Sequence, residues 1–115
     1  MLILGYKTLR RGENFLYSHS LEIAEKQFWL KENLSSLIPL FKVVSFDNLA
    51  IEQLEVQKLL SPEEWEEFYM GDDGTMTFYI DMVNQQFAKS STAEFNKRYT
   101  LLDNVDEMFR KVKEE

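Results

Sequence analysis

The alternation of hydrophobic and polar positions predicts a β-hairpin at the start of the chain. Residues 2–9 (LILGYKTL) and 15–21 (FLYSHSL) are rich in residue types that favour strands. The stretch between them, residues 10–14 (RRGEN), has the glycine and polar residues typical of a turn. We therefore expect two paired strands within the first 21 residues.

A helical period follows the predicted hairpin. With Ile23 placed at zero and an advance of about 100° per residue, five later apolar residues fall within about 60° of it. These residues are Leu30, Leu34, Leu37, Ile38 and Phe41. Phe28 and Trp29 lie off this stripe and would need a second contact surface. Because proline breaks the hydrogen-bond ladder of a helix, Pro39 predicts that the helix ends near Leu37 or Ile38.

The middle of the chain predicts a buried strand and then a short helix. Residues 40–46 (LFKVVSF) are β-branched and aromatic, a composition typical of a buried strand. Asp47 is a favourable N-cap for a helix that starts at Asn48 or Leu49. Residues 50–60 fit strand alternation and a helical period about equally well, so both assignments stay open.

A second hairpin is predicted in the C-terminal half. Residues 75–82 (TMTFYIDM) alternate polar and apolar side chains after an Asp-Gly turn pair, which indicates a strand. Residues 94–102 (EFNKRYTLL) are expected to be its partner. A helix over residues 75–88 is the alternative, because four apolar residues there also share a helical stripe. They are Met76, Ile80, Val83 and Phe87.

The last segment predicts a helix that starts after Asp103, which is a favourable N-cap. Basic residues in its last turns oppose the helix dipole. The apolar face is formed by Val105, Met108, Phe109 and Val112.

These elements predict a small α+β domain with a mainly antiparallel sheet and three or four helices, in the order roughly β-β-α-β-α-α-β-β-α. The 115 residues fit one domain over 1–115, and 44% hydrophobic residues suffice for a packed interior. Cysteine is absent, which excludes disulfides and thiolate metal sites. The first apolar run is too short for a signal peptide, and no stretch approaches the roughly 20 apolar residues of a membrane helix. We therefore expect a cytoplasmic protein that does not associate with membranes.

Negative charge is concentrated in residues 61–74 (SPEEWEEFYMGDDG). This stretch holds six carboxylates and no basic residue, out of a net charge of −7 for the chain. The rest of the chain is therefore nearly neutral. Contact with phosphates or anionic lipids needs clustered lysine and arginine, so nucleic acids and lipid surfaces are disfavoured as partners. A basic protein is the partner that this charge would attract.

No catalytic or cofactor motif is recognisable, and no cofactor is expected. The one histidine, His19, is flanked by serines whose side chains would point to the opposite face of the predicted strand. The four glycines form neither a nucleotide-binding fingerprint nor a phosphate loop. Calcium-loop spacing around Gly74 fails, since Tyr69 would take the first ligand position. Asp72 and Asp73 leave a carboxylate-only magnesium site as a minor alternative.

The acidic stretch predicts a helix with two different faces. Ser61 can cap the backbone N–H of Glu64, and Pro62 suits the first helical position. On a helical wheel the glutamates and the aromatic residues separate to opposite sides. The outward side defines an acidic ridge, made of Glu63, Glu64, Glu67, Asp72 and Asp73, with Trp65 or Tyr69 as possible aromatic anchors. The plain alternative is a solvated helix face with no partner.

The leading hypothesis is a non-catalytic protein-binding domain, without catalytic residues. It would be a small acidic inhibitor or immunity-type protein of bacteria or phages that docks on a basic toxin, nuclease or other cationic partner. One alternative is an assembly subunit that self-associates through aromatic surfaces including Phe28 and Trp29. The other is a small enzyme whose site the sequence does not reveal.

Overall fold

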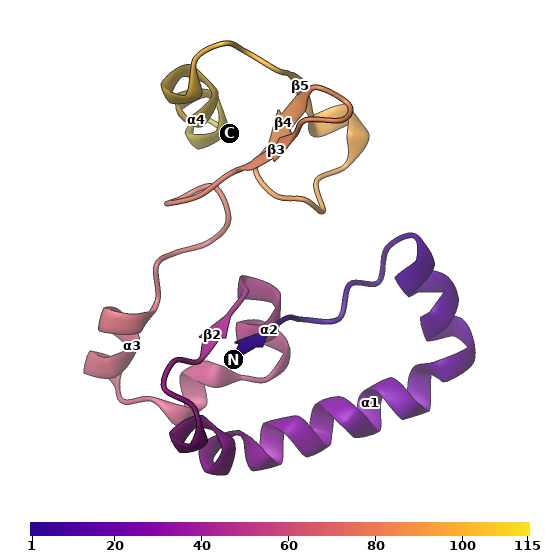
Figure 1. The fold of residues 1–115 in the computed structure, drawn as a ribbon, viewed down its shortest axis with the longest axis vertical. Helices are drawn as coiled ribbons and strands as arrows, with labels where there is room; N and C mark the ends of the chain where they lie inside the picture. The colour runs from indigo at the N-terminus through magenta and orange to yellow at the C-terminus, as the bar shows by residue number, and fades with distance from the viewer. The chain divides into compact units, whose positions relative to one another are not determined.

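The computed structural model describes residues 1–115 and divides them into two units, Met1–Phe68 and Tyr69–Glu115 (Figure 1). Unit 1 contains β1 (Leu2–Ile3), α1 (Arg11–Leu37), the 3-10 helix η1 (Ile38–Leu40), β2 (Ser45–Phe46), α2 (Asn48–Gln53), the 3-10 helix η2 (Val56–Leu59) and α3 (Pro62–Phe68). Unit 2 contains β3 (Tyr79–Asp81), β4 (Gln86–Ala88), the 3-10 helix η3 (Phe95–Lys97), β5 (Tyr99–Thr100) and α4 (Val105–Lys113). None of the helices has the length and apolar character needed to cross a lipid bilayer.

The predicted α+β class is confirmed. In unit 1, β1 and β2 form a parallel pair in which Leu2 lies opposite Ser45 and Ile3 opposite Phe46. In unit 2, three strands form an antiparallel sheet in the order β3-β4-β5. The four α-helices agree with the expected number. One domain over residues 1–115 stays a prediction.

The predicted N-terminal hairpin is wrong. Only Leu2–Ile3 is a strand, and residues 15–21 lie inside α1, which starts at Arg11. Leu16 and Ile23 are both half-buried, and they lie before and after a kink at His19, whose backbone is non-helical. The helix thus extends further upstream than the sequence suggested, in spite of the local preference for strands. At the other end, α1 stops at Leu37 before Pro39, as predicted.

Between residues 40 and 60 the predicted short helix is confirmed, but most of the predicted strand is not formed. Asp47 caps α2, since its Oδ1 accepts hydrogen bonds from the N–H groups of Ala50 (2.7 Å) and Gly5 (2.9 Å). The predicted strand over residues 40–46 shrinks to Ser45–Phe46, because it is paired only with the short β1. Residues 50–60 continue α2 and then form η2, so the helical assignment holds there.

For the second hairpin, the prediction of the first strand is confirmed and the prediction of its partner strand is wrong. β3 confirms a strand in residues 75–82 and excludes the helix over 75–88. Its partner is β4, with Tyr79 opposite Ala88 and Asp81 opposite Gln86, and the predicted partner in residues 94–102 instead supplies β5. The reason is local, since Asp81 Oδ1 accepts the N–H groups of Val83 and Asn84, each at 3.0 Å, and turns the chain back immediately.

The last helix begins one residue later than predicted. Its N-cap is Asn104 and not Asp103, because Asn104 Oδ1 accepts from the N–H groups of Asp106 (2.8 Å) and Glu107 (3.2 Å). Met108 and Val112 are buried as expected, whereas Val105 at the helix start is 58% exposed. The apolar face of α4 is therefore formed by its second and third turns.

Each unit has a small hydrophobic core of its own. The core of unit 1 joins the N-terminal strand, α1, α2 and η2, and Phe68 of α3 packs against it. Its buried members are Ile3, Leu34, Ala50, Leu54 and Val56. The core of unit 2 packs α4 on the three-stranded sheet through Phe87, Met108 and Val112.

Candidate functional site

The start of α3 is built as the sequence predicts. The Ser61 hydroxyl accepts a hydrogen bond from the N–H of Glu64 at 3.2 Å, and Pro62 occupies the first helical position. Both features satisfy or remove backbone donors that a helix start leaves open. The acidic residues of the first turn are also favoured by the positive end of the helix dipole.

The two faces of α3 are present. Phe68 is half-buried and meets the ring of Phe46 edge-on, with ring centres 6.2 Å apart. Trp65, also half-buried, lies against Phe68 at 6.0 Å. These contacts fix the orientation of the helix on unit 1, so that its other side faces solvent.

The solvent side of α3 carries four carboxylates without an internal counterion. They are Glu63, Glu64, Glu66 and Glu67, all exposed. The side-chain ion pairs seen within unit 1 use other acids, Glu22 and Glu55. The structure thus brings Glu63, Glu64 and Glu67 of the predicted ridge together on one face, and no ion pair within unit 1 neutralises their charge.

The remaining ridge residues lie on a turn in unit 2, not on α3. Asp72 and Asp73 are exposed, and the turn is closed by the Thr75 N–H, which donates to the Asp72 carbonyl at 3.0 Å. Gly71 and Gly74 have φ of 94° and 85°, values that favour glycine. Tyr69 donates its hydroxyl to the Asp72 carboxylate, and this hydrogen bond, with burial and the nearby charges, raises the pKa of Tyr69.

The predicted ridge therefore consists of two acidic groups, one in each unit. A continuous surface from α3 to the turn stays a prediction, as do the anchoring roles of Trp65 and Tyr69. Both aromatic side chains are half-buried, so each offers only part of its ring to a partner. No three histidine or acidic side chains gather closely enough to hold a metal ion.

His19 lies in a kink of α1 and not on a strand. Its backbone is non-helical (φ −130°, ψ 22°), and its Nδ1 lies 2.8 Å from Ser18 Oγ and 3.1 Å from the Phe15 carbonyl oxygen. The expectation that Ser18 points away from His19 is wrong, because it assumed strand geometry. Phe15 and His19 also stack with ring centres 3.8 Å apart. These contacts tie the ring to its own helix turn, and no carboxylate is hydrogen-bonded to it.

An apolar groove of about 360 Å³ runs between α1, α2 and the N-terminal segment. Its polar groups largely satisfy one another: Gln53 Oε1 accepts from the Tyr6 N–H (2.8 Å) and from Gln27 Nε2 (3.1 Å). Gln53 Nε2 in turn donates to the Tyr6 carbonyl at 3.0 Å. Sequence reasoning missed this groove, because only the tertiary structure brings Gln27 and Gln53 together. Its lining is Leu4, Gly5, Tyr6, Phe15, Ile23, Lys26, Gln27, Leu30, Ala50, Gln53 and Leu54.

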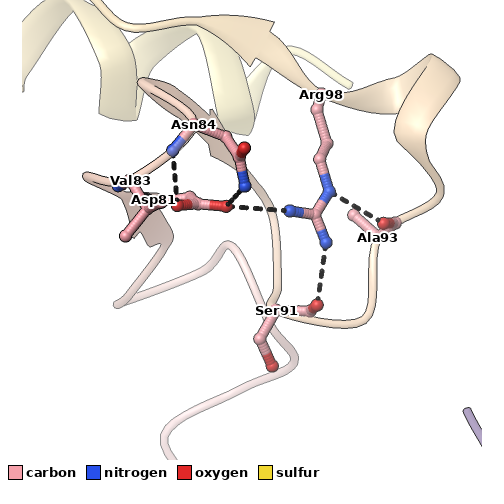
Figure 2. A network of polar contacts seen from close by, with 6 residues as sticks. All are labelled: Asp81, Val83, Asn84, Ser91, Ala93 and Arg98. Carbon is pink, nitrogen blue, oxygen red and sulfur yellow. Dashed lines mark hydrogen bonds and ion pairs between the residues drawn. The ribbon is translucent and has the colours of Figure 1, made fainter. Parts of the chain in front are cut away.

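Arg98, whose side chain is 3% exposed, belongs to a polar network in unit 2. Figure 2 shows its guanidinium between Asp81 and the loop residues Ser91 and Ala93. Its Nε donates to the Ala93 carbonyl (3.1 Å), its Nη2 donates to the Ser91 carbonyl (3.0 Å), and its Nη1 lies 3.7 Å from Asp81 Oδ2. All of these partners are internal, so the network holds the loop against the sheet.

The same network predicts a pH dependence for unit 2. Hydrogen bonds from Asn84, then the Val83 N–H and the Arg98 charge, hold the pKa of Asp81 below its ordinary value. A carboxyl with a lowered folded-state pKa stabilises the fold above its unfolded pKa of about 3.9, and this contribution is lost as the pH falls through the folded-state pKa. Unit 2 of the wild type should therefore lose stability below about pH 4.

Asp81→Asn keeps an acceptor oxygen for the turn and removes the titration. Urea unfolding from pH 7 to pH 3, followed by amide signals of β3 and β4, should give a stability difference between wild type and variant that shrinks toward acid. A difference that is the same at every pH would contradict the role of the Asp81 charge.

Comparisons with protein-family models, with characterised proteins and with solved structures find no match to this chain.

Proposed function

We propose that this chain is a non-catalytic protein-binding domain that docks on a basic protein through the acidic face of α3. The observation that supports this function is the set of four exposed glutamates on one short helix, none of which forms an ion pair within unit 1. A small acidic inhibitor or immunity-type protein of bacterial or phage origin, acting in the cytoplasm on a cationic toxin or nuclease, is the specific form of the proposal.

The electrostatic argument concerns both rate and specificity. Like charges on neighbouring turns of a helix repel one another, at a cost of a few tenths of a kcal/mol per pair. Lysine and arginine side chains on a partner would remove this repulsion and would be steered toward the concentrated charge. Trp65, half-exposed beside the glutamates, offers an aromatic surface of the kind that anchors interfaces. Asp72 and Asp73 would extend the contact to the turn.

One observation favours the assembly function as a second candidate. Phe28 and Trp29 on α1 are 64% and 58% exposed, although large aromatic residues are usually covered in a monomer. The sequence placed both residues off the buried stripe, and no element of unit 1 covers them. A partner or a second copy would cover them in this alternative.

The proposed docking is tested by capture with matched baits. Extract of the source organism is passed over the immobilised wild-type chain and over a variant in which three glutamates of α3 become glutamine. The changes Glu63→Gln, Glu64→Gln and Glu67→Gln keep side-chain size and helix preference. We expect the wild type to retain a basic protein at low salt and to release it at high salt. The variant should fail to retain this protein at low salt.

A second triple variant controls for net charge. Glu13→Gln, Glu25→Gln and Glu32→Gln change exposed residues of α1 by the same total charge. This variant should retain the basic protein as the wild type does. Equal retention by the α3 variant and the wild type would overturn the proposed docking face.

A further inference from the structure

Strand β1 has one neighbour, β2, and therefore one open edge. The N–H groups of Ser45 and Asp47 donate to the carbonyls of Met1 (2.9 Å) and Ile3 (3.2 Å), so these peptide groups face β2. The Gly5 N–H continues this alternation by donating to Asp47. Because peptide groups alternate in direction along a strand, those of Leu2 and Leu4 face the open side.

The residues at this edge are apolar and uncovered. Leu2 and Leu4 are 64% and 63% exposed, whereas Ile3 between them is 7% exposed and enters the core. Exposed edges usually carry lysine, proline or a covering loop that prevents pairing. Here none of residues 1–6 has a charged side chain.

We propose that the open edge of β1 pairs with β1 of a second copy of this chain, antiparallel about a two-fold axis through Ile3. In this register Leu2 lies opposite Leu4 of the partner subunit, and the reverse pair follows by symmetry. Both positions present an N–H and a carbonyl to the open side, so each pair exchanges two hydrogen bonds without a mismatch. The edge is thus self-complementary, and pairing creates a continuous four-stranded sheet.

Pairing also covers the exposed leucines. Leu2 and Leu4 share the solvent face of the strand, and side chains directly opposite in an antiparallel pair approach to about 4.5–5.5 Å between Cβ atoms. Four leucines from the two copies would then contact one another across the junction. An edge this short forms a small interface, so the association is expected at tens to hundreds of micromolar.

Sedimentation of the full chain from about 10 to about 500 µM tests the pairing. The wild type should shift from monomer to dimer over this range. Leu2→Lys with Leu4→Lys places lysines opposite lysines and should weaken the dimer at least about tenfold. Leu2→Lys with Leu4→Glu places each lysine opposite a glutamate in the proposed register and should restore it. Leu9→Lys, a matched change outside β1, should leave the dimer unchanged.

Amide exchange of the wild type provides a test that needs no variant. The N–H groups of Leu2 and Leu4 should exchange more slowly at about 500 µM than at about 10 µM, whereas that of Ile3 should not change. A wild type that stays monomeric, or a lysine–glutamate variant that fails to recover the dimer, would overturn the proposed pairing. These outcomes are independent of the glutamates of α3, so they leave the proposed function untouched.

Discussion

Replacing Phe87 with alanine should unfold unit 2 at room temperature. Phe87 is fully buried, and its ring meets Phe78 edge-on at 6.3 Å and Tyr99 at 5.1 Å. Removing a buried phenylalanine side chain costs about 3–5 kcal/mol, since it loses apolar burial and leaves a cavity. Besides Phe87, the buried residues of this core are Met108 and Val112. A core of this size cannot absorb such a loss.

Two spectroscopic signals follow the effect of this change. Dispersed amide signals from β3, β4 and α4 should collapse in the Phe87→Ala variant and persist in Phe87→Leu, which removes less volume. Both tryptophans, Trp29 and Trp65, lie in unit 1 and report its unfolding by fluorescence. If residues 1–115 form one domain, as the sequence predicts, the urea midpoint of this fluorescence also falls. An unchanged midpoint would contradict the single domain, and unchanged amide signals would contradict the core.

Replacing Arg98 with alanine is expected to have the second largest effect, at roughly 2–4 kcal/mol. The Ser91 and Ala93 carbonyls would each lose a charged donor inside the loop (Figure 2). The guanidinium also lies over the rings of Tyr79 (5.6 Å) and Phe95 (5.0 Å), and alanine removes this packing as well. Amide exchange should accelerate most in the loop before β5.

Two controls separate geometry from charge at this position. Arg98→Lys keeps the positive charge but cannot donate to both carbonyls from a planar group, so it should recover less than half of the lost stability. Lys97→Ala, at the exposed neighbouring residue, should change stability by less than about 0.5 kcal/mol. An Arg98→Lys variant as stable as the wild type would contradict the importance of the two hydrogen bonds that the guanidinium donates to the Ser91 and Ala93 carbonyls.

The elements that the sequence predicted correctly are those with strong local signals. Asp47 caps α2, Pro39 follows the end of α1, and Ser61 with Pro62 starts α3. In each case the contact that starts or ends the helix joins groups within three or four residues, so the local sequence is enough to predict it. The acidic face of α3 was predictable for the same reason, since it depends only on helical spacing.

The errors arose where tertiary contacts decide between two local preferences. Residues 15–21 favour strands locally but form part of α1, where Leu16 and Ile23 are half-buried on either side of the kink at His19. The partner of β3 was missed because the turn depends on hydrogen bonds that the Asp81 carboxylate accepts from the N–H groups of Val83 and Asn84, which a short polar run did not reveal. From the sequence, residues 61–74 were expected to form one surface. In the structure these residues are divided between two units, and the division falls after Phe68.

The central claim, docking through the acidic face of α3, is tested most directly by the salt dependence of affinity. Calorimetric titration of the captured basic protein with the wild type, at about 50 and about 200 mM salt, should show affinity falling steeply as salt rises. The variant with glutamine at positions 63, 64 and 67 should bind at least about tenfold more weakly at low salt and respond less to salt. Equal affinity and equal salt dependence for the two chains would contradict the claim.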